Sequence, residues 1–488
     1  MPVKRMHHLV FRPAAAVLAA AALGSAGICA RAQSANPSSA TDPFYGSVTV
    51  QPVTGGLLKV SLDDAIRRGL ETNLGLKESE YNQKVLHGEE NEALQQFLPT
   101  ITLTGDTGVH QYNLAAEGFS SGVISKFGAL FPGGVLPPGI STITRNDLTE
   151  GQIHFEQTLF SGPVIAGYKA ARSAERVAYY AMESARGQVV QNVATAYLEA
   201  IAAGSEVENA KAREQEADVQ FTHASEAHQA GTVAHLDVLR AQVELQTEEQ
   251  AVIAAQNNLD KDMILLKREI GIDPAQPVEL TDNAPYSELA LQTPAEVLVI
   301  AYKNRQNYQN LINQVAEDKA IHAAYRSRRL PTLKFSSYWG VSTVDGAGTH
   351  GDFSAVGTLS FPIFREAGLR GDEDASKAQL DADTAQLASL RTQIDEQVRD
   401  ALLDVAATQK LVDVARSNVA LATRALSDET DRVNAGVDDN LPLVTAQATL
   451  ASAQTNLVQS LYQYNVAKLA LARAAGVIEQ EYRAYLGQ

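Results

Sequence analysis

The 488-residue sequence predicts a mainly α-helical protein with a small β part, and three observations support this prediction. Long stretches repeat apolar residues every three or four positions, which is typical of helices packed side by side. Four short runs alternate apolar and polar residues, which is typical of strands with one apolar face. The chain is also internally duplicated, so each half should contain two strands and one long helical hairpin.

The duplication is clearest in a short sequence motif around a glycine, which occurs at residues 230–242 and again at residues 435–447. The two copies lie 205 residues apart, and Gly271 and Gly476 have the same spacing. Near the start of each half the spacing is instead 232 residues, as between Pro99 and Pro331. The first half therefore carries 232 minus 205, or 27, additional residues after Pro99, which predicts one enlarged loop.

The N-terminus is predicted to be a signal peptide covering residues 1–32. A basic start at Lys4 and Arg5 precedes an alanine-rich apolar stretch, and small residues at Ala30 and Ala32 fit a cleavage site. Outside this segment no window holds 18 consecutive apolar residues, so no transmembrane helix is predicted for the mature chain. We therefore expect an exported protein.

The single cysteine, Cys29, lies inside that segment. A lipoprotein signal has a small residue immediately before its cysteine, whereas Ile28 occupies this position, so we expect Cys29 to be removed rather than lipidated. The mature chain would then hold no thiol and no disulfide. The formal net charge of −17 argues against nucleic acid as a partner, because phosphate binding needs a basic face.

The other predicted segments follow the duplication. An extended lead-in rich in Ser, Pro, Thr and Gly covers residues 33–60, and a connecting segment covers residues 272–292. The two structural repeats occupy residues 61–271 and 293–476, and residues 477–488 form a C-terminal tail.

Each repeat is predicted to open with a capped helix. A hydroxyl residue stands three positions before an acid at Ser61 and Asp64, and again at Thr293 and Glu296, which is the pattern of a capping box. A later proline in each repeat, Pro99 in the first, should end helical structure because the residue before a proline disfavours the helical conformation.

Four candidate strands follow these prolines and precede the long helices, two in each repeat. Each runs for about 9–14 residues, which is long enough to cross a bilayer when the strand is tilted. Their apolar faces carry Ile101, Leu103 and Val109; Ile153, Phe155 and Leu159; Leu333, Phe335, Trp339 and Val341; and Phe353, Leu359, Phe361 and Ile363. We expect Phe335, Trp339, Phe353 and Phe361 to lie toward lipid or its boundary; the alternative is a soluble hairpin packed on a core.

No constellation of catalytic or metal-binding residues is recognisable. The enlarged loop contains Gly118-Phe119-Ser120-Ser121-Gly122, but a G-x-S-x-G motif needs a strand–turn–helix context with a partner histidine and acid. His223, His228 and His235 lack the i, i+4 spacing of a zinc pair on one helix. We therefore expect no enzyme, no metal site and no cofactor.

The helical hairpins should be very long. About 65 residues precede the first turn at Gly231, which corresponds to about 100 Å of helix at 1.5 Å per residue. The apolar positions spaced by three and four in the first helix of each hairpin are Val190, Val193, Tyr197 and Ile201, and Ile394, Val398, Leu402 and Val405.

The order of these features resembles the TolC-type outer-membrane efflux family, in particular its OprM-like branch. The resemblance rests on residues 61–73, on residues 98–101, on the strand-to-helix junction at residues 157–162 and on both hairpin turns. It implies a homotrimer in which four transmembrane strands per chain build a shared twelve-stranded β-barrel, continued by a periplasmic α-barrel of helices. Independently, four spanning strands leave two open edges, which lipid does not tolerate.

The resemblance also implies a function. An outer-membrane channel of this kind is the exit duct of a tripartite efflux or type I secretion system, and passively conducts substrates delivered by an inner-membrane pump and a periplasmic adaptor. The alternative is a periplasmic coiled-coil adaptor or structural protein without a pore. Membrane-length amphipathic strands favour the channel, since an adaptor needs none.

Two sets of functional residues are expected at the hairpin turns. The far tip of the hairpins should dock an adaptor through Gly231, Thr232, Leu236, Asp237, Gly436 and Val437. In the family pattern, the second turn narrows the entrance with an apolar ring at the position of Leu441 and an acidic ring at the position of Thr445. Because Thr445 is not acidic, we expect Asp438 and Asp439 to supply the carboxylates, unless they are only helix N-terminal acids favoured by the dipole.

Overall fold

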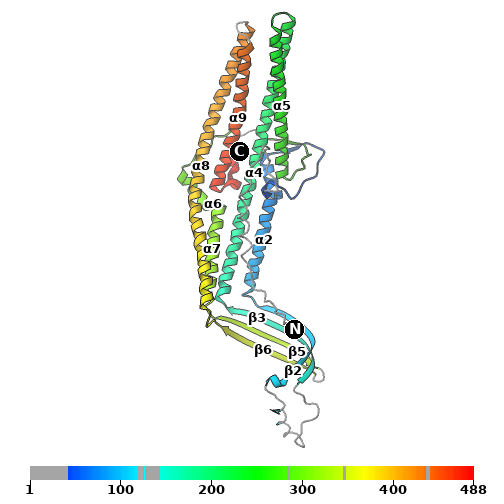
Figure 1. Cartoon of the computed structure of the whole chain (residues 1–488), viewed down its shortest axis with the longest axis vertical. Coiled ribbons are helices and arrows are strands. Elements are labelled where there is room, and N and C mark those ends of the chain that lie inside the picture. Colours follow the sequence, from blue (N-terminus) through cyan, green and yellow to red (C-terminus); the bar gives the residue numbers. More distant parts are fainter. Residues whose placement is uncertain are drawn as a thin grey trace, which may run out of the picture.

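The computed structural model describes residues 42–117, 122, 123, 126, 143–282, 286–344, 348–435 and 440–487. The molecule is elongated, with a curved sheet at one end, long helices leading away from it, and the two hairpin turns at the far end (Figure 1). A short C-terminal helix packs against the long helices about halfway along (Figure 1).

One antiparallel sheet holds the four predicted strands, which confirms them. They are β2 (Thr100–Asn113), β3 (Ile143–Phe160), β5 (Thr332–Val344) and β6 (Gly348–Ser360), in the order β2-β3-β5-β6. Among the described residues, β2 and β6 are the edges of this sheet. The 3-10 helix η2 (Leu114–Glu117) follows β2.

Two long helical hairpins contain nearly half of the residues, and both were predicted. The first is α4 (Gly162–Gln229) with α5 (His235–Glu269), and the second is α8 (Glu366–Asn434) with α9 (Asn440–Ala475). From left to right in the upper part of Figure 1 the order is α8, α9, α4 and α5. The 68 residues of α4 correspond to about 100 Å of helix.

Shorter elements complete each repeat. The first repeat adds α1 (Leu62–Thr72) and α2 (Leu74–Gln95), and the second adds α6 (Pro294–Asn304) and α7 (Gln306–Ser327). In the part of the molecule nearer the sheet, α2 packs along α4, and α7 packs against both α4 and α8.

Four further elements lie in segments for which the sequence predicted no regular structure. After η1 (Pro43–Tyr45), strand β1 (Leu58–Val60) pairs in parallel with β4 (Val278–Leu280), so the lead-in and the connecting segment form a small sheet. The C-terminal α10 (Ile478–Leu486) buries Ile478, Tyr482 and Leu486.

The duplicated glycines end equivalent helices in the same way. Gly271 and Gly476 have φ angles of +69° and +76°, and the following residue in each case donates its N–H to a carbonyl five residues earlier. A Cβ at Gly271 would lie 2.6 Å from the Thr49 carbonyl oxygen, and one at Gly476 would lie 2.7 Å from the Arg305 nitrogen. Glycine is therefore required at both positions for its backbone angle and for space.

The helix starts agree with the prediction at one site and correct it at the other. Thr293 and Glu296 form both bonds of a capping box. Ser61 accepts a hydrogen bond from the Asp64 nitrogen at 3.2 Å, but the Asp64 carboxylate pairs with Arg68 at 2.7 Å and with Arg67. Aspartate is one methylene shorter than the Glu or Gln of a capping box, so its carboxylate favours the arginines over the backbone behind it.

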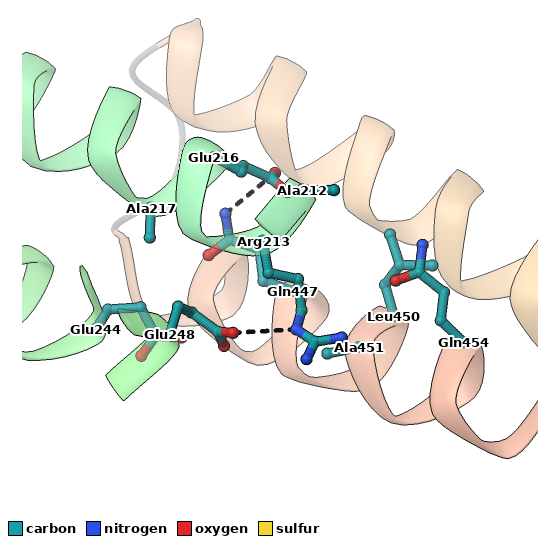
Figure 2. A pocket seen from close by; sticks show the side chains of 10 residues that line it. All are labelled: Ala212, Arg213, Glu216, Ala217, Glu244, Glu248, Gln447, Leu450, Ala451 and Gln454. Carbon is teal, nitrogen blue, oxygen red and sulfur yellow. Dashed lines mark hydrogen bonds and ion pairs between the residues drawn. The ribbon is translucent and has the colours of Figure 1, made fainter. Parts of the chain in front are cut away.

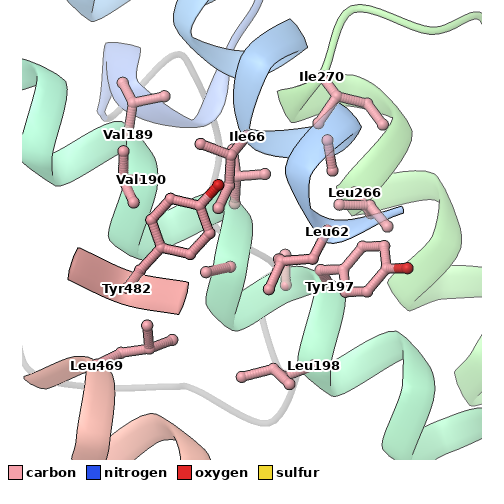
Figure 3. Close-up of a cluster of buried hydrophobic side chains, with 14 of the residues drawn as sticks. Leu62, Ile66, Val189, Val190, Tyr197, Leu198, Leu266, Ile270, Leu469 and Tyr482 are labelled. Carbon is pink, nitrogen blue, oxygen red and sulfur yellow. The ribbon is translucent and has the colours of Figure 1, made fainter. Parts of the chain in front are cut away.

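Two apolar cores lie at mid-height. The apolar residues of α4 that the sequence spaced by three and four are buried in one, and those of α8 are buried in the other. The first core combines Tyr197 of α4 with residues from α1, α5, α9 and α10 (Figure 3). The Tyr197 hydroxyl donates to the Asp282 carboxylate at 2.8 Å, and the same carboxylate accepts the Leu62 N–H at 2.7 Å. The connecting segment is thereby tied to the first repeat.

Helices α7 and α8 bring together the carboxyl groups of Asp318, which is half-buried, and Asp383, which is buried. One oxygen of Asp383 and one of Asp318 have no hydrogen-bond partner within the described residues. Burial, hydrogen bonding to Asp383 and the charge of Asp383 and Glu317 raise the pKa of Asp318 to about 7. The folded protein therefore keeps a proton here that the unfolded chain loses near pH 4.

We expect this pair to make stability depend on pH. Its contribution is fully present below about pH 4 and is lost as the pH rises through about 7, because deprotonation leaves two like charges close together. Asp383→Asn should therefore raise the melting temperature at pH 8 by a few degrees more than at pH 5, relative to the unmodified protein. The exposed Asp374→Asn on the same helix is the matched control; an equal effect of Asp383→Asn at both pH values would contradict the argument.

Candidate functional site

The strand register places a set of exposed apolar side chains on one face of the sheet. Leu103, Ile153, Trp339 and Phe353 are cross-strand neighbours and form one row across all four strands. In the single chain the side chains at Leu103, Trp339 and Phe353 remain 78 %, 59 % and 68 % exposed. Phe335 lies on the same face, in edge contact with Phe155 at 5.9 Å, so this face needs an apolar surrounding.

The predicted Phe361 comes directly after β6 ends at Ser360 and is also exposed. The apolar surface thus continues past the end of the sheet toward α8.

The opposite face of the sheet is polar and mainly acidic. It carries four carboxylates against one lysine, namely Asp106, Glu150, Glu156, Asp352 and Lys334. Gln152 donates to the Asp352 carboxylate at 3.3 Å across the strand that lies between them. The residue between them is Gly340, where a Cβ would lie 2.7 Å from Gln152 Cγ, so glycine makes room for this bond.

The first hairpin turn is closed by local hydrogen bonds. Gly231 has a φ angle of +75°, and Thr232 donates to the Ala227 carbonyl from its N–H at 2.9 Å and from its hydroxyl at 2.8 Å. Leu236 is 55 % exposed, and Asp237 pairs with Arg240 at 3.4 Å. The predicted docking residues of this turn thus form one compact, solvent-exposed surface.

The second turn is described only in part. Gly436, Val437, Asp438 and Asp439 lie outside the described residues. Helix α9 begins at Asn440, so Leu441 and Pro442 lie in its first turn, and Thr445 is exposed one turn further along.

An apolar groove of about 420 Å³ joins the two hairpins near their tips. Leu236, Leu239 and Val243 of α5 line it together with Val444 of α9. The structure therefore brings predicted residue Leu236 close to the helix that carries Leu441 and Thr445.

A polar network that the sequence did not predict lies deeper between the hairpins (Figure 2). Arg213 of α4 pairs with Glu248 of α5 at 3.0 Å and with Glu206 at 3.5 Å. Across to α9, Gln447 donates to Glu216 at 3.2 Å and Thr455 donates to Glu206 at 2.9 Å.

This network fixes the second hairpin against the first. Burial and the charge of Glu248 raise the pKa of the neighbouring Glu244, which shows that carboxylates are crowded here. The one available signal in the sequence was Gln447, which ends the duplicated motif, but its partner on α4 could not be identified from the chain order.

Neither a metal cluster nor a membrane helix is found in the described part of the chain. No three or more His, Cys, Asp or Glu side chains there are placed to hold a metal ion together. No helix among the described residues is long and apolar enough to span a membrane.

Comparison with known proteins gives a consistent result. The sequence profile described as outer membrane efflux protein matches residues 65–271 and 297–477. The alkaline protease secretion protein AprF of Pseudomonas aeruginosa is 24% identical over 371 residues, covering 70% of this chain and 73% of AprF. The outer membrane protein TolC of Escherichia coli is 20% identical over 353 residues, covering 69% and 71%.

Among solved structures, the outer membrane protein VceC of Vibrio cholerae superimposes with a TM-score of 0.69. It is 18% identical, and the match covers 85% of this chain and 96% of VceC. The architecture of long helical hairpins on a four-stranded sheet is thus shared with known channels of the outer membrane.

Proposed function

The chain belongs to the outer membrane efflux protein family and is an outer-membrane exit duct, and we propose that three copies of it close one channel. The observation that carries this proposal is the four-stranded sheet, which has one exposed apolar face and two edges. A bilayer does not tolerate open sheet edges, and bacterial single-chain barrels begin at eight strands. Three chains would supply twelve strands and pair every edge.

The helices support the same assembly. Large apolar side chains are exposed along both α8 and α5. They are Leu403, Leu411, Val414 and Leu421 on α8 and Ile253 and Ile264 on α5. These helices form opposite borders of the chain in Figure 1. A head-to-tail contact between the two borders would bury both surfaces and close a ring.

In such a ring the acidic face of the sheet lines the lumen. Four carboxylates against one lysine per chain give a negative potential along the channel, which favours cations. The chain itself contributes no nucleotide-binding motif, so we propose that an inner-membrane pump drives transport and that a periplasmic adaptor contacts the hairpin tips. The apolar groove beside Leu236 suits the apolar face of an adaptor helix.

A periplasmic adaptor without a pore is the competing function. The exposed row from Leu103 to Phe353 argues against it, because such a surface would be a liability in water.

The assembly can be tested by the migration of the extracted protein. Unheated samples from outer membranes should migrate as a trimer, and boiling should convert them to monomers. Phe353→Arg should reduce the membrane-inserted trimer strongly, because a charge on the lipid face near the bilayer centre costs about 2–4 kcal/mol per chain. Ser354→Arg, on the opposite, polar face of the sheet, is the control and should leave the trimer in place. A folded, membrane-inserted monomer would disprove the proposal.

A further inference from the structure

The first hairpin turn places two histidines against each other. His228 lies in the last turn of α4 and His235 is the first residue of α5. Their ring centroids are 5.3 Å apart, the ring planes are inclined by 37°, and both side chains are exposed. The spacing of seven residues does not match a zinc pair on one helix, but the turn brings the two rings together from different helices.

A hydrogen bond fixes the form of one of the rings. Nδ1 of His228 lies 2.9 Å from the carbonyl oxygen of Val233. A carbonyl oxygen only accepts, so Nδ1 carries the proton, and Nε2 of the neutral ring keeps its lone pair. Metal-binding histidines are typically oriented in this way, with the second ring nitrogen donating to a backbone carbonyl.

The separation of the rings also fits shared coordination. With zinc–nitrogen bonds of about 2.0–2.1 Å and tetrahedral angles, the centroids of two coordinated imidazole rings lie roughly 5 Å apart. The observed separation of 5.3 Å agrees with this value.

We propose that His228 and His235 together bind one divalent transition-metal ion, of the class of Zn²⁺, Cu²⁺ and Ni²⁺, at the first hairpin turn. Imidazole suits these ions, whereas Mg²⁺ and Ca²⁺ need oxygen ligands. Water completes the coordination, so binding is weaker than at a structural site with four protein ligands. The ion connects the end of α4 to the start of α5, and the site exists whether or not this tip docks an adaptor.

The internal duplication supplies a substitution for each histidine. The residues 205 positions further on are Val433 and Asn440, at the corresponding ends of α8 and α9. The cap bonds agree, since the Ala230 N–H bonds the Glu226 carbonyl at 3.0 Å and the Ala435 N–H bonds the Asp431 carbonyl at 2.9 Å. His228→Val and His235→Asn therefore introduce the residues that the duplicated sequence carries at the equivalent positions.

The test uses the full-length, untagged protein in detergent, titrated with ZnCl₂ by calorimetry. We expect one Zn²⁺ per chain, and a loss of affinity of at least tenfold in His228→Val and in His235→Asn. His223→Gln, an exposed histidine on α4 outside the pair, should bind like the unmodified protein. Unchanged affinity in either pair variant, or no stoichiometric binding to the unmodified protein, would overturn the proposal.

A spectroscopic measurement makes the test independent of the variants. Cu²⁺ bound at one equivalent per chain should show two coordinating nitrogens by electron paramagnetic resonance. A spectrum with one nitrogen or none would contradict shared coordination by the two rings.

Discussion

Arginine introduced at Thr232 or at Val437 should abolish export while leaving the amount of outer-membrane trimer unchanged. The reason is the position of Thr232 at the exposed tip of the first hairpin, next to the apolar groove that Leu236 lines. An adaptor helix laid in this groove would meet a bulky, charged side chain at its point of contact. Export of a fluorescent pump substrate from cells that depend on this duct measures the effect.

The controls separate docking from helix capping. The Thr232 hydroxyl bonds the Ala227 carbonyl, so Thr232→Arg also removes a hydrogen bond worth about 1 kcal/mol. Thr232→Ala removes the same bond without adding bulk, and it should retain most of the export. If Thr232→Ala is as defective as Thr232→Arg, capping is the cause; if export survives arginine at both turns, the docking surface lies elsewhere.

The sheet and the hairpins could be predicted because their signals are local. Alternation with a period of two places Trp339 and Phe353 on one face without knowledge of their neighbours, and the register confirms that they pair. Spacing by three and four likewise identified Tyr197 and Ile394 as buried. Glycines with left-handed backbone angles ended the helices where the duplication indicated.

Contacts between distant segments could not be predicted from such patterns. Lys468 occupies an otherwise apolar stretch of α9 and is fully buried, which lowers its pKa to about 8. Its ammonium group lies 3.3 Å from the Ser287 carbonyl oxygen and 4.6 Å from the ring centroid of Tyr464. Nothing in the local sequence indicates that the connecting segment crosses α9 here, just as nothing paired Gln447 with Glu216 or brought His228 to His235.

The second hairpin turn, which we propose to form the entrance of the channel, departs from the pattern that the family resemblance implies. Thr445 stands where an acid is expected, while Asp438 and Asp439 precede Leu441. Three chains would place six carboxylates at the mouth, and like charges at close range are relieved by bound cations or by opening. Pro442 falls in the first turn of α9, where its missing N–H costs little and its fixed φ angle stiffens the start of the helix.

Two variants of this turn should therefore change different properties of the channel in planar bilayers. Leu441→Ala should raise the resting conductance severalfold, because we propose that this leucine contributes an apolar ring that narrows the entrance. Asp438→Asn combined with Asp439→Asn should lower the preference for cations without abolishing it, since the carboxylates of the sheet still line the lumen. Asp352 lies on β6, far from the hairpin turns. Asp352→Asn is therefore the control that measures how much the sheet carboxylates contribute to the preference for cations. Unchanged conductance in the first variant and unchanged selectivity in the second would remove these residues from the gate and leave the two aspartates as helix N-terminal acids.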